Sequence, residues 1–267
     1  MRTTALLTCA LLVGGGGRRA AAAQAPAQSE FHWGGRIAAS KRLEVKGVNG
    51  EIRAAGIAAG SQVEVSATKR ARRSDPESVE IIVDTTENGV TICAVYPTPR
   101  HARQDNTCTP GDHWSSSTED NDVVVDFDVR VPAGVKFYGR TVNGGVEAQH
   151  LGADVWAYTV NGSVHVSTTG YAEATTVNGS ITAEMGRADW PEAVEFTTVN
   201  GGITLELPAS FSAEVRAKTL NGDVISDFPL LVTGRFGPRN WHGTIGQGGR
   251  ELDLSTVNGT IRLRKAT

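Results

Sequence analysis

One tetrapeptide, Thr-Val-Asn-Gly, recurs along this chain and sets the size of its structural unit. Its seven copies, two of them altered, place Asn-Gly pairs at Asn49-Gly50, Asn143-Gly144, Asn161-Gly162, Asn178-Gly179, Asn200-Gly201, Asn221-Gly222 and Asn258-Gly259. From Asn143 to Asn221, successive Asn residues are 18, 17, 22 and 21 positions apart. A period of this length indicates one supersecondary unit that stacks on its neighbours.

The residues on both sides of each Asn-Gly pair alternate between apolar and polar. Around Asn161, the apolar positions are Val155 and Ala157 before the pair and Val164 and Val166 after it. Period-two alternation predicts a strand on each side, and Gly supplies the positive φ that a bend between them needs. Each repeat is therefore predicted to be a strand, a turn and a second strand.

Two architectures fit such repeats. In a meander of hairpins, Asn-Gly would be a two-residue type I′ loop. In a β-solenoid it would be a corner, and successive coils would stack about 4.8 Å apart with their Asn side chains in a ladder. We favour an all-β, repeat-built solenoid, because a narrow lumen needs small interior side chains. Small residues do stand at the interior positions, as at Ala148, Ala157, Ala174, Ala183 and Ala217.

The N-terminal residues 1–23 have the pattern of a secretory signal, with an early Arg, an apolar run and then small residues. Residues 30–267 are predicted to be a single domain, with an irregular half at 30–135 and regular repeats at 136–267. Removal of the leader would leave 23 basic residues against 29 acidic ones, which disfavours a nucleic-acid partner. We expect an exported protein, periplasmic, extracellular or on the cell surface, without an integral membrane segment after cleavage.

Two cysteines, Cys93 and Cys108, would remain in the mature chain. A pair this close is expected to form a disulfide in an oxidising compartment. Closing a loop of about 15 residues contributes roughly 3 kcal/mol in the chain-entropy model. Residues 97–122, which contain Cys108, have prolines, serines and acids without periodicity, and they are predicted to be a long surface loop.

An eighth Asn-Gly stands at Asn88, but the apolar positions that follow it have the opposite parity from the repeats. A two-residue Asn88-Gly89 loop would pair Val83 with Ala94 and keep the apolar side chains on one face. Residues 79–96 are therefore predicted to be a hairpin outside the repeat.

Two further stretches resemble a known family. They are Val129-Arg-Val-Pro-Ala-Gly134, which leads into the regular repeats, and Gly243-Thr-Ile-Gly-Gln-Gly-Gly249, which leads into the last one. With the repeats between them, they look like the bacterial DUF4097 family, whose members are labelled as candidate adhesins. The likeness extends roughly from Leu43 to Leu263. It implies a β-helix-like exported domain with no established activity and no catalytic residues to carry over.

Familiar catalytic and cofactor motifs are absent from the sequence: there is no GxSxG, HExxH or P-loop, and no GxGxxG after a strand. The leading hypothesis is a non-enzymatic envelope or surface protein, an adhesin or scaffold, that binds an envelope glycan or a surface protein through one face of the solenoid. No cofactor is expected.

The alternative is a polysaccharide-processing β-helix enzyme, a lyase or hydrolase. Such an enzyme needs acids, with His, Lys or Arg, at matching outward positions on adjacent coils. Four residues after the Asn, the outward positions are Glu147, His165, Thr182 and Thr204. No second acid joins the one Glu-His pair, so binding is favoured over catalysis.

Six residues after the Asn, three repeats that are consecutive in the sequence carry Glu184, Glu206 and Asp227. If these coils stack in chain order, the carboxylates form a column with neighbours about 5 Å apart. The simpler interpretation is a set of solvated acids at strand ends. The alternative is a weak divalent-cation site, since hard cations take carboxylate oxygens.

Overall fold

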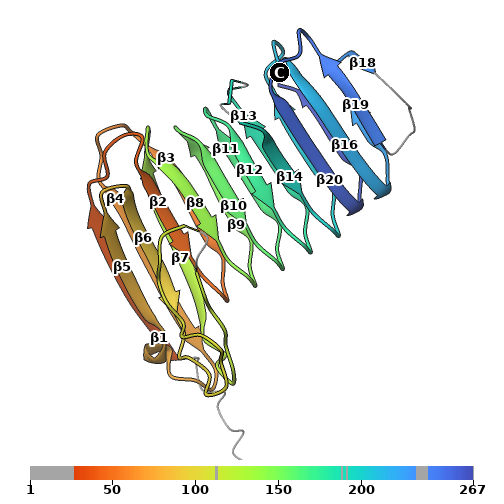
Figure 1. Ribbon diagram of the computed structural model, residues 1–267. Helices are drawn as coiled ribbons and strands as arrows, with labels where there is room; N and C mark the ends of the chain where they lie inside the picture. The colour runs from red at the N-terminus through yellow and green to blue at the C-terminus, as the bar shows by residue number, and fades with distance from the viewer. Residues whose placement is uncertain (1–26, 112–113, 188, 191, 233–239, 267) are drawn as a thin grey trace, which may run out of the picture.

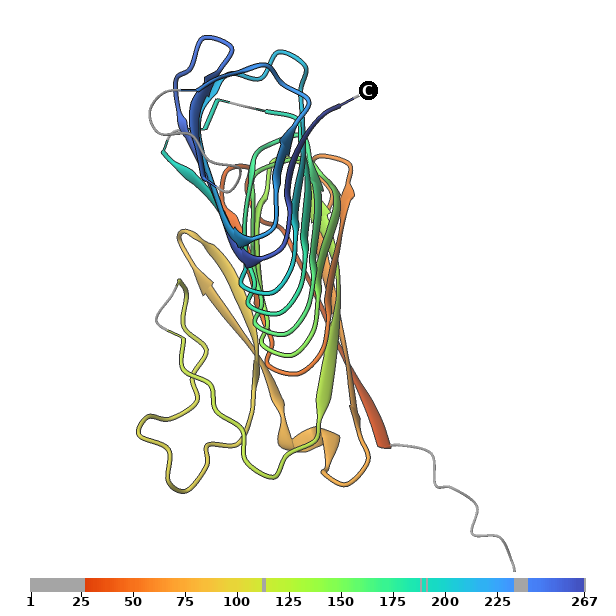
Figure 2. The ribbon, with the colours of Figure 1, turned by 90° about the vertical axis from the view of Figure 1, so that its right-hand side faces the viewer.

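The computed structural model describes residues 27–111, 114–187, 189–190, 192–232 and 240–266. These residues form two β-sheets, sheet A and sheet B, in which the strands lie side by side and are stacked along the long axis of the molecule (Figures 1 and 2). The leader predicted at residues 1–23 lies outside the described residues. In the part of the chain that the structure describes, no helix is long and apolar enough to cross a membrane.

Both sheets combine many short strands, and their spatial order differs from the chain order. Sheet A contains β1 (Ala27–Gly35), β4 (Val63–Ala71), β7 (Val124–Pro132), β3 (Ile52–Ile57), β9 (Val146–Leu151), β11 (Val164–Thr168), β13 (Ile181–Met185), β15 (Ile203–Leu207), β21 (Ile261–Lys265) and β17 (Val224–Ser226). Sheet B contains β18 (Leu230–Val232), β19 (Asn240–Ile245), β16 (Ala213–Asn221), β20 (Glu251–Asn258), β14 (Val194–Thr197), β12 (Ala172–Thr175), β10 (Val155–Tyr158), β8 (Lys136–Arg140), β2 (Arg42–Lys46), β6 (Gly89–Val95) and β5 (Glu80–Thr86). One short 3-10 helix spans Pro76–Ser78.

Each Thr-Val-Asn-Gly repeat is one coil of a flattened solenoid. A strand of sheet B runs up to the Asn-Gly corner, and a strand of sheet A leads away from it. Strands of successive coils are parallel, as β10 is to β12 and β11 to β13. Figure 2 shows the corners as nested loops at one edge of the molecule. Parallel neighbours confirm the solenoid and exclude the meander of antiparallel hairpins.

The corner Asn side chains form the expected ladder on the outside of the molecule. Each Asn from Asn143 onward donates from Nδ2 to Oδ1 of the Asn in an adjacent coil, at 2.7–2.8 Å. In space, the ladder runs through Asn49, Asn143, Asn161, Asn178, Asn200, Asn258 and Asn221. An amide has both a donor and an acceptor, so one residue type can continue such a chain of hydrogen bonds through every coil.

Thr and Gly of the tetrapeptide have separate roles inside the corner. Thr176 is buried, and its hydroxyl donates to the carbonyl oxygen of Gly162 in the preceding coil at 2.8 Å. A Cβ on Gly179 would lie 2.0 Å from that same oxygen. Positive φ is not the general reason for glycine here, because among the corner glycines only Gly50 (127°) and Gly144 (158°) have it. Close approach of successive coils requires the glycine instead.

Replacing Thr176 with Val should lower the free energy of unfolding by roughly 1–2 kcal/mol, because the buried Gly162 carbonyl loses its hydroxyl donor while the side-chain volume is kept. Thr182→Val is the matched control. Thr182 is exposed on β13, and its replacement should change stability by less than about 0.5 kcal/mol. Urea denaturation of the two variants makes the comparison, and equal effects would show that the buried hydroxyl does not stabilise the corner.

The last two coils exchange places relative to the sequence. β15 pairs with β21, and β21 then pairs with β17. The coil at Asn258 therefore lies between those at Asn200 and Asn221. At this end β19 runs antiparallel to β16, and at the other end β1 and β4 are antiparallel, as are β5 and β6. Antiparallel additions thus end both sheets at the N-terminal end of the stack and sheet B at the other end, which protects those edges from pairing with another chain, whereas sheet A ends at the short parallel strand β17.

The predicted hairpin exists, but its register was wrong by two residues. Thr86 pairs with Gly89, so the loop is Glu87-Asn88, and Val83 faces Ile92 instead of Ala94. Gly89 is not a turn residue, because it begins β6 and a Cβ there would lie 1.9 Å from the Arg42 carbonyl oxygen on β2. The hairpin also joins the stack, since β6 is parallel to β2.

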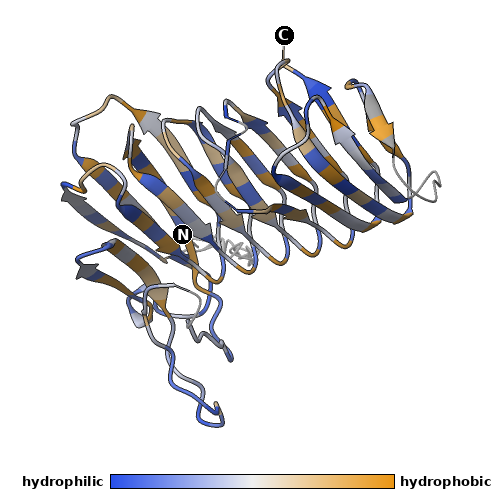
Figure 3. Cartoon of the chain, turned by 45° about the horizontal axis from the view of Figure 1, so that its top comes forward, coloured by the Kyte–Doolittle hydropathy of each residue, from blue (hydrophilic) through white to orange (hydrophobic). Residues whose placement is uncertain are grey.

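The core lies between the sheets. Inward positions alternate with outward ones along every coil, as Figure 3 shows by hydropathy. Phe137 and Phe196 on sheet B and Phe127 on sheet A are fully buried, with small residues such as Ala157 and Ala183 between the larger ones. The outward positions on both sheets are therefore free to carry function.

Candidate functional site

One outward position, five residues before the corner Asn, forms a continuous row across sheet B. In spatial order the row runs through Glu44, Tyr138, Trp156, Glu173, Glu195, Asp253 and Arg216. Tyr138 pairs with Trp156, and Trp156 with Glu173. Glu195 follows Glu173 in the register that places Thr175 opposite Thr197. Parallel strands about 4.8 Å apart thus bring aromatic and acidic side chains into direct succession.

The aromatic part of the row is a packed stack. The rings of Tyr138 and Trp156 are parallel within 5°, with centroids 4.3 Å apart. The guanidinium of Arg42 lies 5.0 Å from the Tyr138 centroid, and Tyr171 meets Trp156 edge-on at 5.5 Å. Because the neighbouring rings hold one another in place, the Trp156 ring is already ordered and presents a rigid surface.

At one end of the row, Thr109 and Gly111 of the long loop contact β2. Lys46 is buried, and its Nζ donates to the carbonyl oxygens of Thr109 and Gly111, both at 2.6 Å. Glu44 is also buried and accepts from Gly111 N at 2.9 Å and from Arg42 at 2.7 Å. Burial alone would raise the pKa of Glu44, but the hydrogen bonds from Arg42, Gly111 and Lys46 hold it below its ordinary value.

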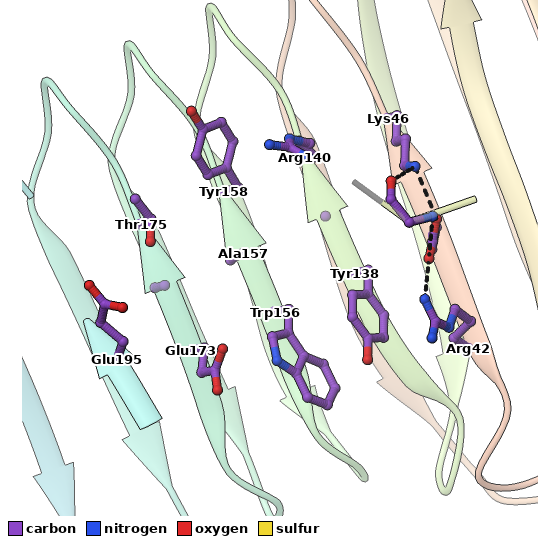
Figure 4. Close-up of a pocket in the computed structure, with 14 residues that line it drawn as sticks. Arg42, Lys46, Tyr138, Arg140, Trp156, Ala157, Tyr158, Glu173, Thr175 and Glu195 are labelled. Carbon is purple, nitrogen blue, oxygen red and sulfur yellow. Dashed lines mark hydrogen bonds and ion pairs between the residues drawn. The ribbon is translucent and has the colours of Figure 1, made fainter. Parts of the chain in front are cut away.

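These features line a groove of about 400 Å³ on the outer face of sheet B. Its floor crosses β2, β8, β10, β12 and β14, and the labelled side chains in Figure 4 other than the inward Ala157 stand on the same face of these strands. The lining residues outside the row include Arg140, Tyr158 and Thr175. The volume falls within the usual range for ligand sites.

Glu173 and Glu195 form the acidic part of the groove. The pKa of Glu173 is raised to about 7, chiefly by burial, with a smaller contribution from the negative charges of Glu195 and Glu192 and against a hydrogen bond from Trp156 that lowers it. Glu195 is exposed, and its Oε1 accepts from the Thr197 hydroxyl at 2.6 Å. Neither carboxylate has an ion pair within the described residues, so this end of the groove carries uncompensated negative charge.

The structure places the other predicted residues elsewhere. Cys93, buried on β6, and Cys108 in the loop are joined in a disulfide with their Cα atoms 5.6 Å apart. Glu147, His165 and Thr182 stand in register on the outer face of sheet A, away from the groove. The Asn-Gly pairs lie at the corners, along one edge of the molecule.

The predicted carboxylate column of Glu184, Glu206 and Asp227 was wrong. Glu184 does pair with Glu206, but Glu206 pairs with Arg264 on β21. Asp227 follows β17, on the far side of β21. The inserted coil therefore places a guanidinium between the second and third acids. In the described part of the chain, no three His, Cys, Asp or Glu side chains are grouped so as to hold a metal ion.

Residues 145–264 match the family model described as Toastrack DUF4097. The resemblance to DUF4097 is confirmed. The DUF4097 match begins directly after the Asn143-Gly144 corner, so it includes Trp156, Glu173 and Glu195 but not the loop or β2. No curated protein sequence matches this chain.

Two crystal structures are similar to this chain at low identity. One is of a "putative cell adhesion protein" from Clostridium sporogenes, with 12% identity, a TM-score of 0.43, and coverage of 90% of this chain and 100% of that one. The other is of a "putative adhesin" from Bacteroides fragilis, with 10% identity, a TM-score of 0.34, and coverage of 90% and 99%. Similarity at this level supports no conclusion about the ligand or the activity of this chain.

Sequence reasoning missed the groove although one signal for it was present. The residues four positions after each corner Asn include Glu147 and His165. The residues five positions before each corner Asn include Trp156, Glu173 and Glu195, and comparing them in the same way would have indicated the groove. The wall made by Gly111 had no such signal, because it depends on where an aperiodic loop folds back.

Proposed function

We propose that this chain is an exported, non-enzymatic protein of the cell envelope or cell surface that binds an extended partner along the outer face of sheet B. The observation that carries the proposal is the groove itself. Several parallel strands contribute to it, and its aromatic stack is rigid before any ligand arrives, which lowers the entropic cost of binding.

Export is supported by two features of the chain. The leader pattern at residues 1–23 is typical of secretion, and the Cys93–Cys108 disulfide suits an oxidising compartment. Within such a compartment, the accessible partners are envelope glycans and the exposed parts of surface proteins.

Hydrolysis of a polysaccharide is the second candidate, because Glu173 and Glu195 are neighbouring carboxylates and one has a raised pKa. Glycoside hydrolysis requires two carboxyl groups that flank the scissile bond. Glu173 and Glu195 instead project from adjacent strands on the same open face of sheet B, which is not a flanking arrangement. Binding is therefore the better-supported function.

A glycan array probed with the mature protein tests this proposal. Trp156→Ala should weaken binding to the hits at least tenfold, since truncation of a central aromatic anchor typically costs 2 kcal/mol or more. His165→Ala is the matched control, because His165 is on the next strand of the same coil but on sheet A. Equal losses in both variants would overturn the assignment to sheet B, and reducing sugar released from the hits would overturn the non-enzymatic part.

A further inference from the structure

The ion pairs found around the groove do not include Glu173 or Glu195. Glu44 pairs with Arg42 at 2.7 Å and with Lys46 at 3.1 Å. Beyond these, Lys136 pairs with Asp154 at 3.7 Å, and Arg216 lies 4.0 Å from Asp253. Among the described residues, only hydrogen bonds from neutral side chains reach Glu173 and Glu195.

Two carboxylates at adjacent parallel positions repel each other, and like charges directly opposite destabilise a sheet. Elsewhere in this protein such a pair of acids has a basic residue beside it, since Arg264 lies opposite Glu206 on its other side. Glu173 instead has Trp156 on its other side. An indole face attracts a cation, and Lys136 Nζ already lies 5.9 Å from the centroid of the Trp156 ring, so the missing positive charge would be held by the two carboxylates.

A second row beside the first consists of hydroxyl groups. It runs through Tyr158, Thr175, Thr197 and Ser255, which pair in succession across the four strands. Hydroxyl side chains are both donors and acceptors, and so are the hydroxyl groups of a sugar. The surface next to Glu173 and Glu195 therefore suits a polyhydroxylated ligand that carries positive charge.

We propose that the groove binds a glycan with free amino groups, and that Glu173 and Glu195, beside the Trp156 ring, hold one ammonium of an unacetylated amino sugar. This inference rests on the proposed function and names its ligand class. The ammonium would make charge-assisted hydrogen bonds to the two carboxylates, which are about twice as strong as neutral ones. The neighbouring hydroxyl row would hydrogen-bond the sugar.

The raised pKa of Glu173 is what is expected of a carboxylate without a positively charged neighbour. The groups that interact with it are Trp156 on β10, Tyr138 on β8, Tyr171 before β12, Glu195 on β14 and Glu192 before β14, and neither glutamate stabilises its ionised form. A bound ammonium would lower the raised pKa of Glu173. Binding below about pH 7 should therefore release a proton from Glu173.

The test compares two probes that differ only in acetylation: the β-1,4-linked hexamers of glucosamine and of N-acetylglucosamine. Calorimetry at about pH 5 keeps the sugar amines charged, because the neighbouring ring oxygens lower their pKa below the ~8 of an α-amino group. The glucosamine hexamer should bind at least tenfold more tightly. Two buffers of different ionisation enthalpy should reveal the proton release, and Glu173→Gln should abolish it.

The double variant Glu173→Gln, Glu195→Gln should remove the preference for the glucosamine hexamer. Its matched control is Glu184→Gln, Glu206→Gln, which neutralises two paired carboxylates on sheet A and should leave both affinities unchanged. Equal loss in the control would show general electrostatic attraction and would overturn the site. Thermal melts identify any variant that is misfolded.

The remaining outcomes separate this inference from the proposed function. If both hexamers bind equally, or only the acetylated one binds, the amine specificity is overturned while binding along sheet B stands. If a hexalysine peptide binds as tightly as the glucosamine hexamer, the sugar specificity is overturned. If no glycan on the array binds at all, the proposed function fails with it.

Discussion

Replacing Gly179 with Ala is expected to lower the free energy of unfolding by roughly 3 kcal/mol, at the upper end of the range for overpacking. The new Cβ would lie 2.0 Å from the Gly162 carbonyl oxygen and 2.8 Å from the Ser163 nitrogen. Both are backbone atoms, and the Gly162 oxygen is already held by Thr176. The coils must therefore separate locally, which breaks the corner hydrogen bonds on both sides.

Gly34→Ala is the control for this substitution, because the nearest atom to its added Cβ would be the Val63 carbonyl oxygen at 3.8 Å. It should change stability by no more than about 1 kcal/mol. At about 2–4 °C per kcal/mol for a chain of this size, the two variants should differ clearly in melting temperature. The double variant Asn178→Ala, Gly179→Ala should be the least stable, since it also loses two ladder hydrogen bonds. An unchanged melting temperature in both Gly179 variants would show that the Asn-Gly pairs are not structural corners.

Much of the fold could be predicted from the sequence, because the repeat and its parity are local. Alternation around Asn161 gives two strands and the inward set of Val155 and Val164, both fully buried. The identical tetrapeptide at each turn favours stacking, which the parallel Asn ladder confirms. The reason for the corner glycine was wrong, because contact with the preceding coil depends on a neighbour in space.

The order of coils could not be predicted from the repeat. Each copy is compatible with any neighbouring copy, so nothing local in the sequence requires β21 to lie between β15 and β17. β18, β19 and β16 occupy the end of sheet B, and the last coil lies inside them. The metal hypothesis at Glu184, Glu206 and Asp227 failed for this reason, whereas the row through Trp156, Glu173 and Glu195 uses coils that follow chain order.

Removing the disulfide should have the other large effect. The double variant Cys93→Ser, Cys108→Ser is expected to lose about 3 kcal/mol of unfolding free energy, the chain-entropy value for a loop of about 15 residues. Equilibrium unfolding with and without reductant measures it: reductant should destabilise the wild type by a similar amount and leave the variant unaffected. Two free thiols in protein recovered from the periplasm would contradict the assignment.

The same variant should also weaken ligand binding, because the disulfide holds the loop where Gly111 closes the end of the groove. Lys46→Met separates the two attachments. It removes the hydrogen bonds to Thr109 and Gly111 but keeps the disulfide and most of the buried stem. If the disulfide positions the wall, Lys46→Met should bind more tightly than the double Ser variant. If Lys46 and Glu44 position the wall, Lys46→Met should instead bind the ligand more weakly than the double Ser variant. Glu44 would then be a buried carboxylate without its lysine partner, and the wall would detach although the disulfide stays intact.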